Sequence, residues 1–477
     1  MKRQTDFAKT KIIGTLGPAI RNPAILNDLL NEGMNVARLN FSHASHEEHA
    51  ENIQMLRDAS KKSDIPIAIL ADLCGPKIRL GIMEKPVEIV SGETIVISTM
   101  PEAYTGKYKM VPTEYSQLAA DVKPGNRILM DDGLLQVIVR ESAGADVICE
   151  VIDGGLVKSR KGMNLPNVDI SVSAITDKDR KDLDFIVTQD IDFIALSFVR
   201  SRDDIRELRW LMKERGKSLP IIAKIEKPEA IDDIDAIIKE TDMIMVARGD
   251  LGVEMPPQDV PVLQKMIIHK CVEANKPVIT ATQMLESMIT NPRPTRAESS
   301  DVANAVFDGT DAVMLSGETS VGKYPLNAVR IMQQIIRASE KHALSSEFVK
   351  IRSGGLNITD AENICHSACI MAQEAGAKAI ITITKSGITA KLLSKFRPDI
   401  PIIAFSEEEK TIRELNIVWG VQGELIEEVN DTDSTLKRAK KTALALGYIK
   451  PGDKVVYTTG IPLLTSKAAN MVKIDTA

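Results

Sequence analysis

The sequence of 477 residues lacks the marks of several large classes of protein. Its net charge of -6 shows no basic excess, which argues against a primary role on nucleic acids or membrane surfaces. No apolar run is long enough to span a bilayer, and the start, MKRQTDFAKTK, turns hydrophilic where a signal peptide would carry an apolar core. No low-complexity tract or short-period repeat interrupts the chain. We therefore expect a globular protein with no nucleic-acid or membrane partner.

Cysteine is also scarce: there are five residues, an odd number, and no CxxC pair. This argues against a disulfide framework and a zinc site, and it predicts a cytoplasmic protein with reduced thiols. His43, His46 and His49 lie close together, but their spacing does not place them on one tight helical face. We therefore do not expect these histidines to form a metal site.

The sequence does contain short apolar strands that alternate with amphipathic helical segments through about its first 340 residues. Near-continuous apolar strands separated by helices indicate a parallel sheet covered by helices. Eight strands are the number of a closed (β/α)8 TIM barrel, and an open doubly wound sheet is the alternative. The predicted strands are 11–17, 35–42, 66–73, 192–199, 220–226, 243–250, 277–283 and 312–318.

One connection is much longer than the others. Between the third and fourth predicted strands, β-rich and turn-rich segments such as KPVEIVSGETIVIST predict a small inserted β-barrel domain. This loop lies on the C-terminal face of a barrel, where active sites form, so the insert is positioned to act as a lid. After about residue 343 an open α/β pattern begins, which suits regulation or assembly. The predicted domains are a catalytic barrel of residues 1–74 and 171–342, a lid of residues 75–170, and a C-terminal α/β domain of residues 343–477.

The predicted strands end with many polar residues. In AKIEKPEA, residues 223–230, a buried strand ends with Lys224 and Glu226, which the alternation of side chains places on one face. Ionised groups there cost free energy unless they are paired, metal-bound or hydrated, so a plain salt bridge is the alternative to a site. Polar residues end five further strands, which one shared site explains better than separate capping devices. They are Arg38, Asn40 and Ser42; Asp72; Arg248 and Asp250; Thr280 and Thr282; and Ser316 and Glu318.

The residue types at these ends favour metal-assisted handling of an anionic substrate. Glu226 and Asp250 supply hard oxygen ligands that suit Mg²⁺ or Mn²⁺ rather than zinc. Arg38 and Lys224 could hold a phosphoryl group, and the amides of Gly249 and Asp250 could form a small anion-binding terminus. The sequence has no GxxxxGKS phosphate loop, no kinase-type glycine-rich motif, and no serine–histidine pairing that suggests acyl transfer. The pattern predicts an enzyme for a substrate bearing phosphate and carboxylate.

The sequence resembles the pyruvate kinases along essentially its whole length. The resemblance rests on the order and spacing of KIIGTLGPA, MNVARLNFSH, GPKIRLG, KGMNLP, AKIEKPEAI, MVARGDLGVE, ITATQMLESM, NPRPTRAE and MLSGETSVGKYP. It implies the glycolytic transfer of a phosphoryl group from phosphoenolpyruvate to ADP, giving pyruvate and ATP, with Mg²⁺ or Mn²⁺ as cofactor. It also implies the fold of that family, including the inserted lid.

The resemblance gives the residues of the central site their roles. It implies that Glu226 and Asp250 bind the divalent metal, while Lys224 stabilises the transferring phosphoryl group with the help of Arg38. The two charges of AKIEKPEA would then act on opposite sides of one phosphate, which disfavours a plain salt bridge.

The resemblance also implies residues for the rest of the substrate. The amides of Gly249 and Asp250, with Thr282, would hold the carboxylate. Thr282 and Ser316 resemble the family's candidates for the relay that protonates the enolate, although the donor itself stays open.

The nucleotide contacts implied by the resemblance lie near the second strand and on the lid. They are Asn40, His43, Arg79 and Lys161. For Lys161, within SRKG, a solvated surface charge is the alternative.

A monovalent cation site is present in part. Many pyruvate kinases hold K⁺ through groups that match Asn40, Ser42, Asp72 and the carbonyl of Leu73, all present here. The potassium-dependent pattern, however, has a glutamate where this chain has Lys77 and a lysine where it has Cys74. A lysine ammonium carries the same charge as K⁺, so we expect Lys77 to substitute for the ion and K⁺ to be dispensable. An exposed Lys77 with K⁺ still bound is the alternative.

The C-terminal domain contains TKSGITAK, residues 384–391, between a predicted strand and a helix. Hydroxyls, a lysine and a glycine at a helix start predict a phosphate cradle, and the matching loop binds allosteric sugar phosphates in regulated members of the family. The downstream segment TTGIPLLTSKAAN lacks the glycine-rich pattern of fructose bisphosphate control, so AMP or a sugar monophosphate is at least as good a candidate as fructose bisphosphate. An unoccupied structural turn is the alternative. The expected effector residues are Thr384, Lys385, Ser386, Gly387 and Thr389.

Three functions fit the sequence to different degrees. An active phosphotransferase is favoured, and the family's usual homotetramer is expected with it. A barrel lyase acting through a metal-bound pyruvate enolate would not need the lid or Lys161, and the presence of Lys224, Glu226 and Asp250 argues against a catalytically silent sensor.

Overall fold

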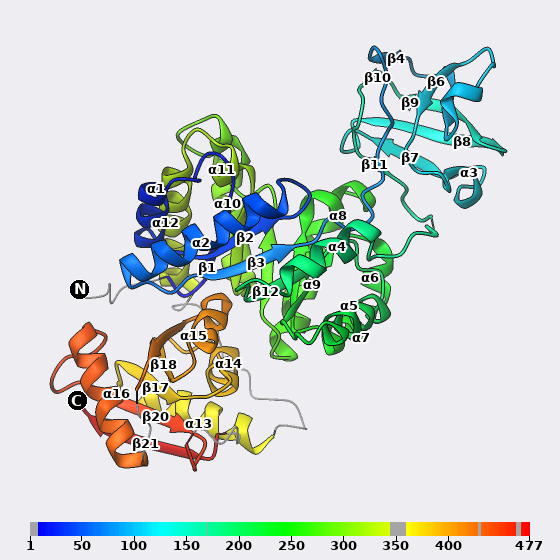
Figure 1. Cartoon of the computed structure of the whole chain (residues 1–477). Helices are drawn as coiled ribbons and strands as arrows, with labels where there is room; N and C mark the ends of the chain where they lie inside the picture. The colour runs from blue at the N-terminus through cyan, green and yellow to red at the C-terminus, as the bar shows by residue number, and fades with distance from the viewer. Residues whose placement is uncertain (1–7, 169, 344–358, 428–430, 464–468) are drawn as a thin grey trace.

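The computed structural model describes residues 8–168, 170–343, 359–427, 431–463 and 469–477. Within these ranges, parallel strands close into a barrel in the order β1-β16-β15-β14-β13-β12-β3-β2 (Figure 1). The predicted TIM barrel is confirmed, and its closure excludes the open doubly wound sheet. The strands are β1 Lys11–Thr15, β2 Met34–Asn40, β3 Ala68–Asp72, β12 Phe193–Leu196, β13 Ile221–Ile225, β14 Met243–Ala247, β15 Val278–Ala281 and β16 Ala312–Leu315.

The helices around the barrel begin at well-capped positions. Ser45 with Glu48 and Thr176 with Asp179 form capping boxes, in which each side chain pairs with the other residue's backbone amide. The barrel helices are α1 Pro23–Asn31, α2 His46–Ser63, α4 Asp177–Ile186, α5 Arg202–Glu214, α6 Pro228–Asp232, α7 Ile234–Glu240, α8 Arg248–Glu254, α9 Val260–Glu273, α10 Arg296–Asp308, α11 Gly317–Ser320 and α12 Pro325–Ala343, with the 3-10 helix η2 Glu286–Ile289.

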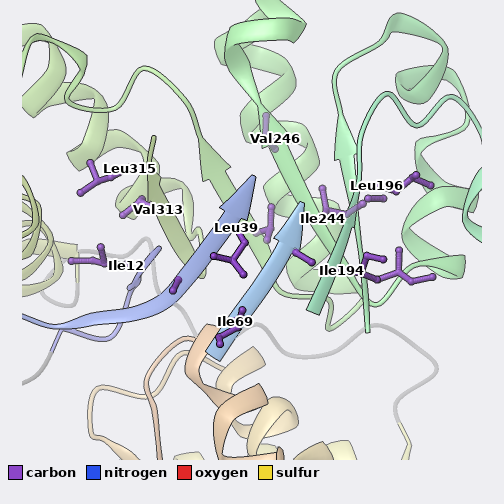
Figure 2. Close-up of a cluster of buried hydrophobic side chains, with 14 of the residues drawn as sticks. Ile12, Leu39, Ile69, Ile194, Leu196, Ile244, Val246, Val313 and Leu315 are labelled. Atoms are coloured by element: carbon purple, nitrogen blue, oxygen red, sulfur yellow. The ribbon is translucent and has the colours of Figure 1, made fainter. Parts of the chain in front are cut away.

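Alternate residues of each barrel strand enter two different apolar layers. Ile194, Leu196, Ile244 and Val246 belong to the layer between the barrel wall and its helices (Figure 2). The intervening residues fill the barrel interior, and Phe193 is one of them. The strands are apolar on both faces, so burying a polar side chain inside the barrel costs free energy. Polar residues on the inner face are therefore expected near strand ends, where the barrel opens.

The inserted β domain follows β3 and stands away from the barrel (Figure 1). It is a half-barrel: a six-stranded sheet in the order β11-β7-β8-β9-β5-β6 beside the two-stranded sheet β10-β4. The predicted insertion is therefore confirmed. Its elements are β4 Val87–Ile89, β5 Thr94–Ser98, η1 Pro101–Ala103, β6 Lys109–Pro112, α3 Leu118–Asp121, β7 Arg127–Met130, β8 Leu135–Ala143, β9 Asp146–Asp153, β10 Gly155–Val157 and β11 Met163–Asn164.

The C-terminal domain is a mixed sheet in the order β19-β18-β17-β20-β21, with β21 antiparallel. This confirms the predicted open α/β domain. Its elements are α13 Asp360–Glu374, β17 Ala379–Ile383, α14 Ile388–Lys395, β18 Ile402–Ser406, α15 Glu409–Glu414, η4 Leu415–Ile417, β19 Val421–Leu425, α16 Thr432–Leu446, β20 Lys454–Thr459 and β21 Met471–Thr476.

The C-terminal domain covers the N-terminal face of the barrel, which we call the floor. The Gly420 amide donates to the carbonyl of Lys9 just before β1 (2.9 Å), and Arg397 pairs with Asp311 just before β16 (2.9 Å). The apolar cluster of the barrel interior continues into this domain through Leu415. The opposite face, which we call the mouth, is therefore the open end of the barrel.

The numerical domain boundaries stay predictions, and the one at residue 343 borders residues 344–358, which lie outside the described residues. Residues 464–468 of the predicted TTGIPLLTSKAAN segment also lie outside them. The five cysteines are free thiols, and none of the helices among the described residues has the length and apolar character needed to cross a membrane.

Candidate active site

Four charged side chains from three strands meet at the mouth of the barrel. Lys224 Nζ lies 3.0 Å from Glu226 Oε1 and 3.4 Å from Asp72 Oδ1. Arg38 Nε lies 2.7 Å from Asp72 Oδ2. The ends of β2, β3 and β13 therefore bring these four side chains together.

The register of β13 explains why Lys224 and Glu226 face the barrel axis. Ile222 packs in the barrel interior, whereas Ala223 and Ile225 pack in the outer layer. Lys224 and Glu226 have the same parity as Ile222, so their side chains leave the inner face at the end of the strand.

The cations and carboxylates of this cluster stabilise one another's charged forms. Burial would lower the pKa of Lys224, but Asp72 and Glu226 outweigh it and raise that pKa above its usual value. Burial would raise the pKa of Asp72, but Lys224 and Arg38 outweigh it and lower that pKa. Lys224 and Asp72 are therefore ionised at neutral pH.

Glu226 is the least satisfied member of the cluster. Its Oε2 accepts from the Phe198 amide (2.7 Å), whereas its buried Oε1 lies 3.0 Å from the Lys224 ammonium as an ion pair and accepts no hydrogen bond from the described residues. Burial and the Asp250 carboxylate raise the pKa of Glu226, against the effect of Lys224. A divalent cation between Glu226 and Asp250 would relieve both costs.

The donor set fits a Mg²⁺-type ion. Among the described residues no group of three or more His, Cys, Asp or Glu side chains forms a metal centre. The pair Glu226 and Asp250 is nevertheless sufficient for Mg²⁺, which is often held by one or two carboxylates with water and substrate phosphate as the other ligands.

The turn after β15 is strained and tied to α8. Thr282 has φ of 67° and Gln283 has φ of 55°. A positive φ costs free energy, most of all for a β-branched residue such as Thr282, and such strain recurs at functional sites. Thr282 Oγ1 accepts from the Gly249 amide (2.7 Å) and donates to the Ala281 carbonyl (2.6 Å). A Cβ on Gly249 would lie 3.2 Å from this hydroxyl, so the glycine permits the close approach.

Ser316, the predicted relay residue after β16, has a buried hydroxyl with no hydrogen-bond partner among the described residues. Two other polar strand ends make structural contacts instead. Glu318 accepts from the amides of Leu285 (3.0 Å) and Ser316 (2.7 Å), and the buried Thr280 hydroxyl donates to Thr310 (3.0 Å). These two residues fit the capping and pairing explanation.

The predicted nucleotide residues are divided between the barrel and the lid. Asn40 ends β2, and His43 is exposed on the loop that follows it. In the lid, Arg79 donates to the Arg160 carbonyl (3.1 Å), and Lys161 pairs with Asp131 (2.8 Å). Lys161 thus has a partner within its own domain.

The other two histidines of this region have structural partners. His46 Nε2 lies 2.8 Å from Asp182 Oδ1, and its ring stacks on Phe185. The buried His49 ring stacks on Phe41, and its Nε2 lies 3.0 Å from the His43 carbonyl.

The side chains predicted for the monovalent site lie on neighbouring strand ends. Asn40 Oδ1 accepts from the Ser42 amide (3.1 Å), and the Leu73 carbonyl accepts from Ser197 Oγ (2.7 Å). Asp72 already contacts two cations. Lys77 is exposed, and its Cε would lie 3.8 Å from a Cβ on Gly162 at the root of the lid.

The predicted effector loop forms a tight turn between β17 and α14. The Gly387 amide donates to Thr384 Oγ1 (3.0 Å), and Gly387 has φ of 78°. Lys385 and Ser386 are exposed at the tip of the turn, whereas Thr384 and Thr389 are buried. The loop is tied to α15, because the Thr411 hydroxyl donates to the Lys385 carbonyl (2.7 Å).

Sequence reasoning missed three residues that shape the cluster. Lys224 Nζ donates to Ser197 Oγ (2.7 Å), and Arg38 donates to Thr15 Oγ1 (3.1 Å). The Phe198 amide reaches Glu226 because Phe198 has φ of 53°. Ser197 carried a visible signal, since it is the one polar residue in the apolar run DFIALSFV after its first position.

A closed (β/α)8 barrel with charged groups gathered at its mouth defines the class of TIM-barrel enzymes. The chain matches the family described as "Pyruvate kinase, barrel domain" over residues 7–329 and "Pyruvate kinase, alpha/beta domain" over residues 362–475. It belongs to the pyruvate kinase family.

Similar proteins agree with this assignment along the full chain. A pyruvate kinase of Clostridium acetobutylicum is 44% identical over 469 residues, covering 98% of this chain and 99% of that protein. A pyruvate kinase of Geobacillus stearothermophilus is 45% identical over 470 residues, covering 98% of this chain and 80% of that protein. The crystal structure of a Cryptosporidium parvum pyruvate kinase aligns with a TM-score of 0.91 and 40% identity, covering 98% of this chain and 96% of that one.

The family assignment sets the coarse function. The chain is a phosphotransferase with pyruvate kinase activity, in which phosphoenolpyruvate and ADP give pyruvate and ATP. The family generally uses a divalent metal.

Proposed function

We propose that the cluster at the barrel mouth carries out this phosphoryl transfer with the residues expected from the sequence. The observation that carries the proposal is the meeting of Lys224, Arg38, Asp72 and Glu226 beside Asp250, with one buried Glu226 oxygen left without a hydrogen bond. The two cations suit a phosphate, and the carboxylates of Glu226 and Asp250 suit a divalent ion bound to it.

Glu226 and Asp250 hold the divalent ion, Mg²⁺ or Mn²⁺. When bound, the ion supplies Lewis-acid stabilisation of phosphate and enolate oxygens. The carboxylates supply the negative charge that attracts the ion. Burial and the repulsion between the two carboxylates raise the pKa of Glu226, and a bound cation offsets both.

Lys224 and Arg38 stabilise the charge of the transferring phosphoryl group. Lys224 is suited to this role because Asp72 and Glu226 keep it protonated, and Ser197 fixes the direction of its ammonium group (2.7 Å). Arg38 is held by Asp72 and Thr15, so neither cation has to reorganise as charge develops.

The substrate carboxylate binds to the amides of Gly249 and Asp250 with the help of Thr282. The substrate would compete with Thr282 for the Gly249 amide, which the threonine hydroxyl occupies at 2.7 Å. The same threonine and Ser316 are the candidates for protonating the enolate. The Ser316 hydroxyl has no hydrogen-bond partner among the described residues, so it can bind a water molecule that relays the proton.

The nucleotide binds between Asn40 and His43 on the barrel and Arg79 and Lys161 on the lid. Lys161 has to exchange its partner Asp131 for the nucleotide phosphates, which requires the lid to close over the mouth. The Lys161 side chain is 42% exposed, so breaking its pair with Asp131 costs little free energy.

The enzyme works without K⁺. Asp72, a member of the monovalent site with Asn40, Ser42 and Leu73, is already neutralised by Arg38 and Lys224. Lys77 supplies the remaining charge when its flexible side chain turns from Gly162 toward this site. Turnover in tetramethylammonium buffer should be unchanged by added K⁺, and Lys77→Glu should make turnover K⁺-dependent. Strong stimulation of the wild type by K⁺ would reject this proposal.

The C-terminal loop binds a phosphorylated effector, AMP or a sugar monophosphate, through Lys385, Ser386 and the hydroxyls and amides around Gly387. The exposed tip and the start of the eight-residue helix α14 suit a phosphate group. AMP and ribose 5-phosphate should reduce the cooperativity of phosphoenolpyruvate binding, and Ser386→Ala should weaken this effect. If Ser386→Ala responded to both effectors as the wild type does, the loop would not be the effector site.

Two broader expectations belong to the same proposal. We expect a homotetramer, which sedimentation analysis would establish, and a cytoplasmic location, in keeping with the five free thiols.

The residue roles can be tested through the metal. Asp250→Asn should raise the Mg²⁺ concentration needed for half-maximal ATP formation by about 10-fold or more, because it removes one of two charged ligands. Asp259→Asn, an exposed aspartate nine residues further on, is the matched control and should change nothing. An unchanged Mg²⁺ requirement in Asp250→Asn would exclude this residue as a ligand.

A further inference from the structure

One buried carboxylate joins the barrel, the helix after β14 and the lid. Glu254, the last residue of α8, accepts through Oε1 from Lys227 Nζ (2.7 Å) and from Asn164 Nδ2 (2.8 Å). Lys227 directly follows Glu226 at the end of β13. Asn164 lies in β11 of the inserted domain, where it pairs with Leu129 of β7.

Stability alone does not account for this arrangement. The Lys227 and Glu254 side chains are 7% and 0% exposed, and Glu254 Oε2 is buried without a hydrogen-bond partner among the described residues. Desolvating an ion pair costs about as much as the pair returns, and an unsatisfied oxygen adds to that cost. A well-packed apolar pair would hold the same elements together at lower cost, so the polar contacts are better explained by the geometry that they specify.

The contact stands at the point where the lid meets the barrel. Asn164 is three residues from Lys161, and Asp131 both pairs with Lys161 (2.8 Å) and donates its amide to the Gly162 carbonyl (3.1 Å). The lid approaches α8 at a second point, since a Cβ on Gly133 would lie 3.7 Å from Val253 Cγ1. The orientation of Asn164 therefore sets the orientation of the segment that carries Lys161.

We propose that Glu254 is a positioning residue for the reaction, acting through Lys227 on the metal side of the site and through Asn164 on the nucleotide side. The Lys227 contact fixes the end of β13 beside Glu226. The Asn164 contact anchors the base of the lid to the helix that carries Gly249 and Asp250. The proposal rests on the proposed roles of Glu226 and Lys161, and it adds that one carboxylate keeps the two halves of the site in register.

Two substitutions of Asn164 separate the lid contact from the rest. Asn164→Ala removes the donor, and Asn164→Asp replaces it by an acceptor that faces Glu254. Loss of one hydrogen bond to a charged group should raise the KM for ADP about 10-fold in Asn164→Ala, and the facing carboxylates should raise it further in Asn164→Asp. The KM for phosphoenolpyruvate should stay within about twofold of wild type, because the lid does not contact that substrate in this scheme.

Asn126→Asp is the matched control, since it makes the same change within the lid. The side chain of Asn126 accepts from the Lys123 amide (2.6 Å), a bond that an aspartate keeps. Its ADP kinetics should therefore be those of the wild type. Thermal unfolding of all variants verifies that they fold. If Asn164→Asp does not fold, Asn164→Ala alone provides the test.

The outcomes decide the proposal. A selective rise in the KM for ADP supports it. Wild-type ADP kinetics in the Asn164 variants, or an equal rise in both KM values, overturns it. Glu226→Gln is assayed beside them. If this variant retains turnover, the proposed function is rejected. If it loses turnover while Asn164→Asp behaves as the wild type, only the positioning role is rejected.

Discussion

The two faces of the barrel both carry buried charges, but they satisfy them differently. At the floor, Asp192 is fully buried and pairs with Arg57 of the barrel (2.8 Å) and Arg413 of the C-terminal domain (2.8 Å), and it also accepts from the Ile69 amide (2.8 Å). At the mouth, Glu226 is equally buried, yet one of its oxygens accepts no hydrogen bond from the described residues.

Left-handed backbone, by contrast, occurs at both faces: on the floor side Asp64, Asn275 and Arg397 have φ of 55°, 54° and 48°. Phe198, Thr282 and Gln283, all at the mouth, have positive φ angles between 53° and 67°. At the floor, Lys9 just before β1 and Lys11 at its start donate to the carbonyls of Asp399 (2.7 Å) and Val421 (2.6 Å) in the C-terminal domain. The buried Asp192 at the floor is therefore saturated by two arginines and an amide, whereas the buried Glu226 at the mouth keeps bonding capacity that a metal can take up.

The largest expected effect is at the mouth. Lys224→Arg keeps a positive charge between Asp72 and Glu226 but moves it, so kcat should fall about 10³-fold, or about 4 kcal/mol, while the thermal midpoint changes little. Lys276→Arg is the matched control, because Lys276 donates to the Thr241 carbonyl near the floor (2.6 Å) and should tolerate the change. Activity of Lys224→Arg within tenfold of wild type would break the contrast between the two faces.

The next effect is a pH dependence at the floor. Burial lowers the pKa of Lys11 from 10.5 to about 8, with Glu340 opposing it. Between pH 8 and the unfolded pKa, the unfolded chain binds more protons than the folded one, so this group makes stability rise with pH by about 3 kcal/mol at most. Below pH 8 its contribution is constant.

Lys11→Met should remove that rise, and exposed Lys454→Met should leave it unchanged. Urea unfolding at pH 7.5 and pH 10 measures the difference. Equal pH dependence in wild type and Lys11→Met would show that Lys11 is not responsible for it.

A smaller effect should come from the ion network at the floor. Arg413→Met leaves the buried Asp192 with one arginine instead of two and should lower stability by about 2 kcal/mol, with kcat at 25 °C within about twofold of wild type. Arg140→Met removes an exposed pair with Glu150 and should cost less than about 1 kcal/mol. An Arg413→Met variant that loses activity but not stability would show that this network serves catalysis rather than stability.

The sequence predicted the fold well, because apolar strands and alternating parity are local signals. They gave the barrel, the inserted domain and the inward direction of Lys224 and Glu226. Contacts that depend on turn geometry were harder. The Phe198 amide reaches Glu226 only through a left-handed backbone conformation, and Glu318 turns back to cap two amides rather than face the site.

Contacts between distant segments could not be predicted at all. Asn164 and Glu254 are 90 residues apart, and neither belongs to a strand end of the barrel. Their meeting depends on how the lid docks, which no periodicity in the sequence encodes.

Direct Mn²⁺ binding by the free enzyme tests the central claim, that the mouth holds a divalent ion on Asp250 and on Glu226, whose buried Oε1 the fold leaves without a hydrogen bond. Electron paramagnetic resonance titration of wild type, Glu226→Gln and Arg413→Met should show Mn²⁺ affinity lowered by about 10-fold or more in Glu226→Gln alone. Equal affinity in all three proteins would contradict the account.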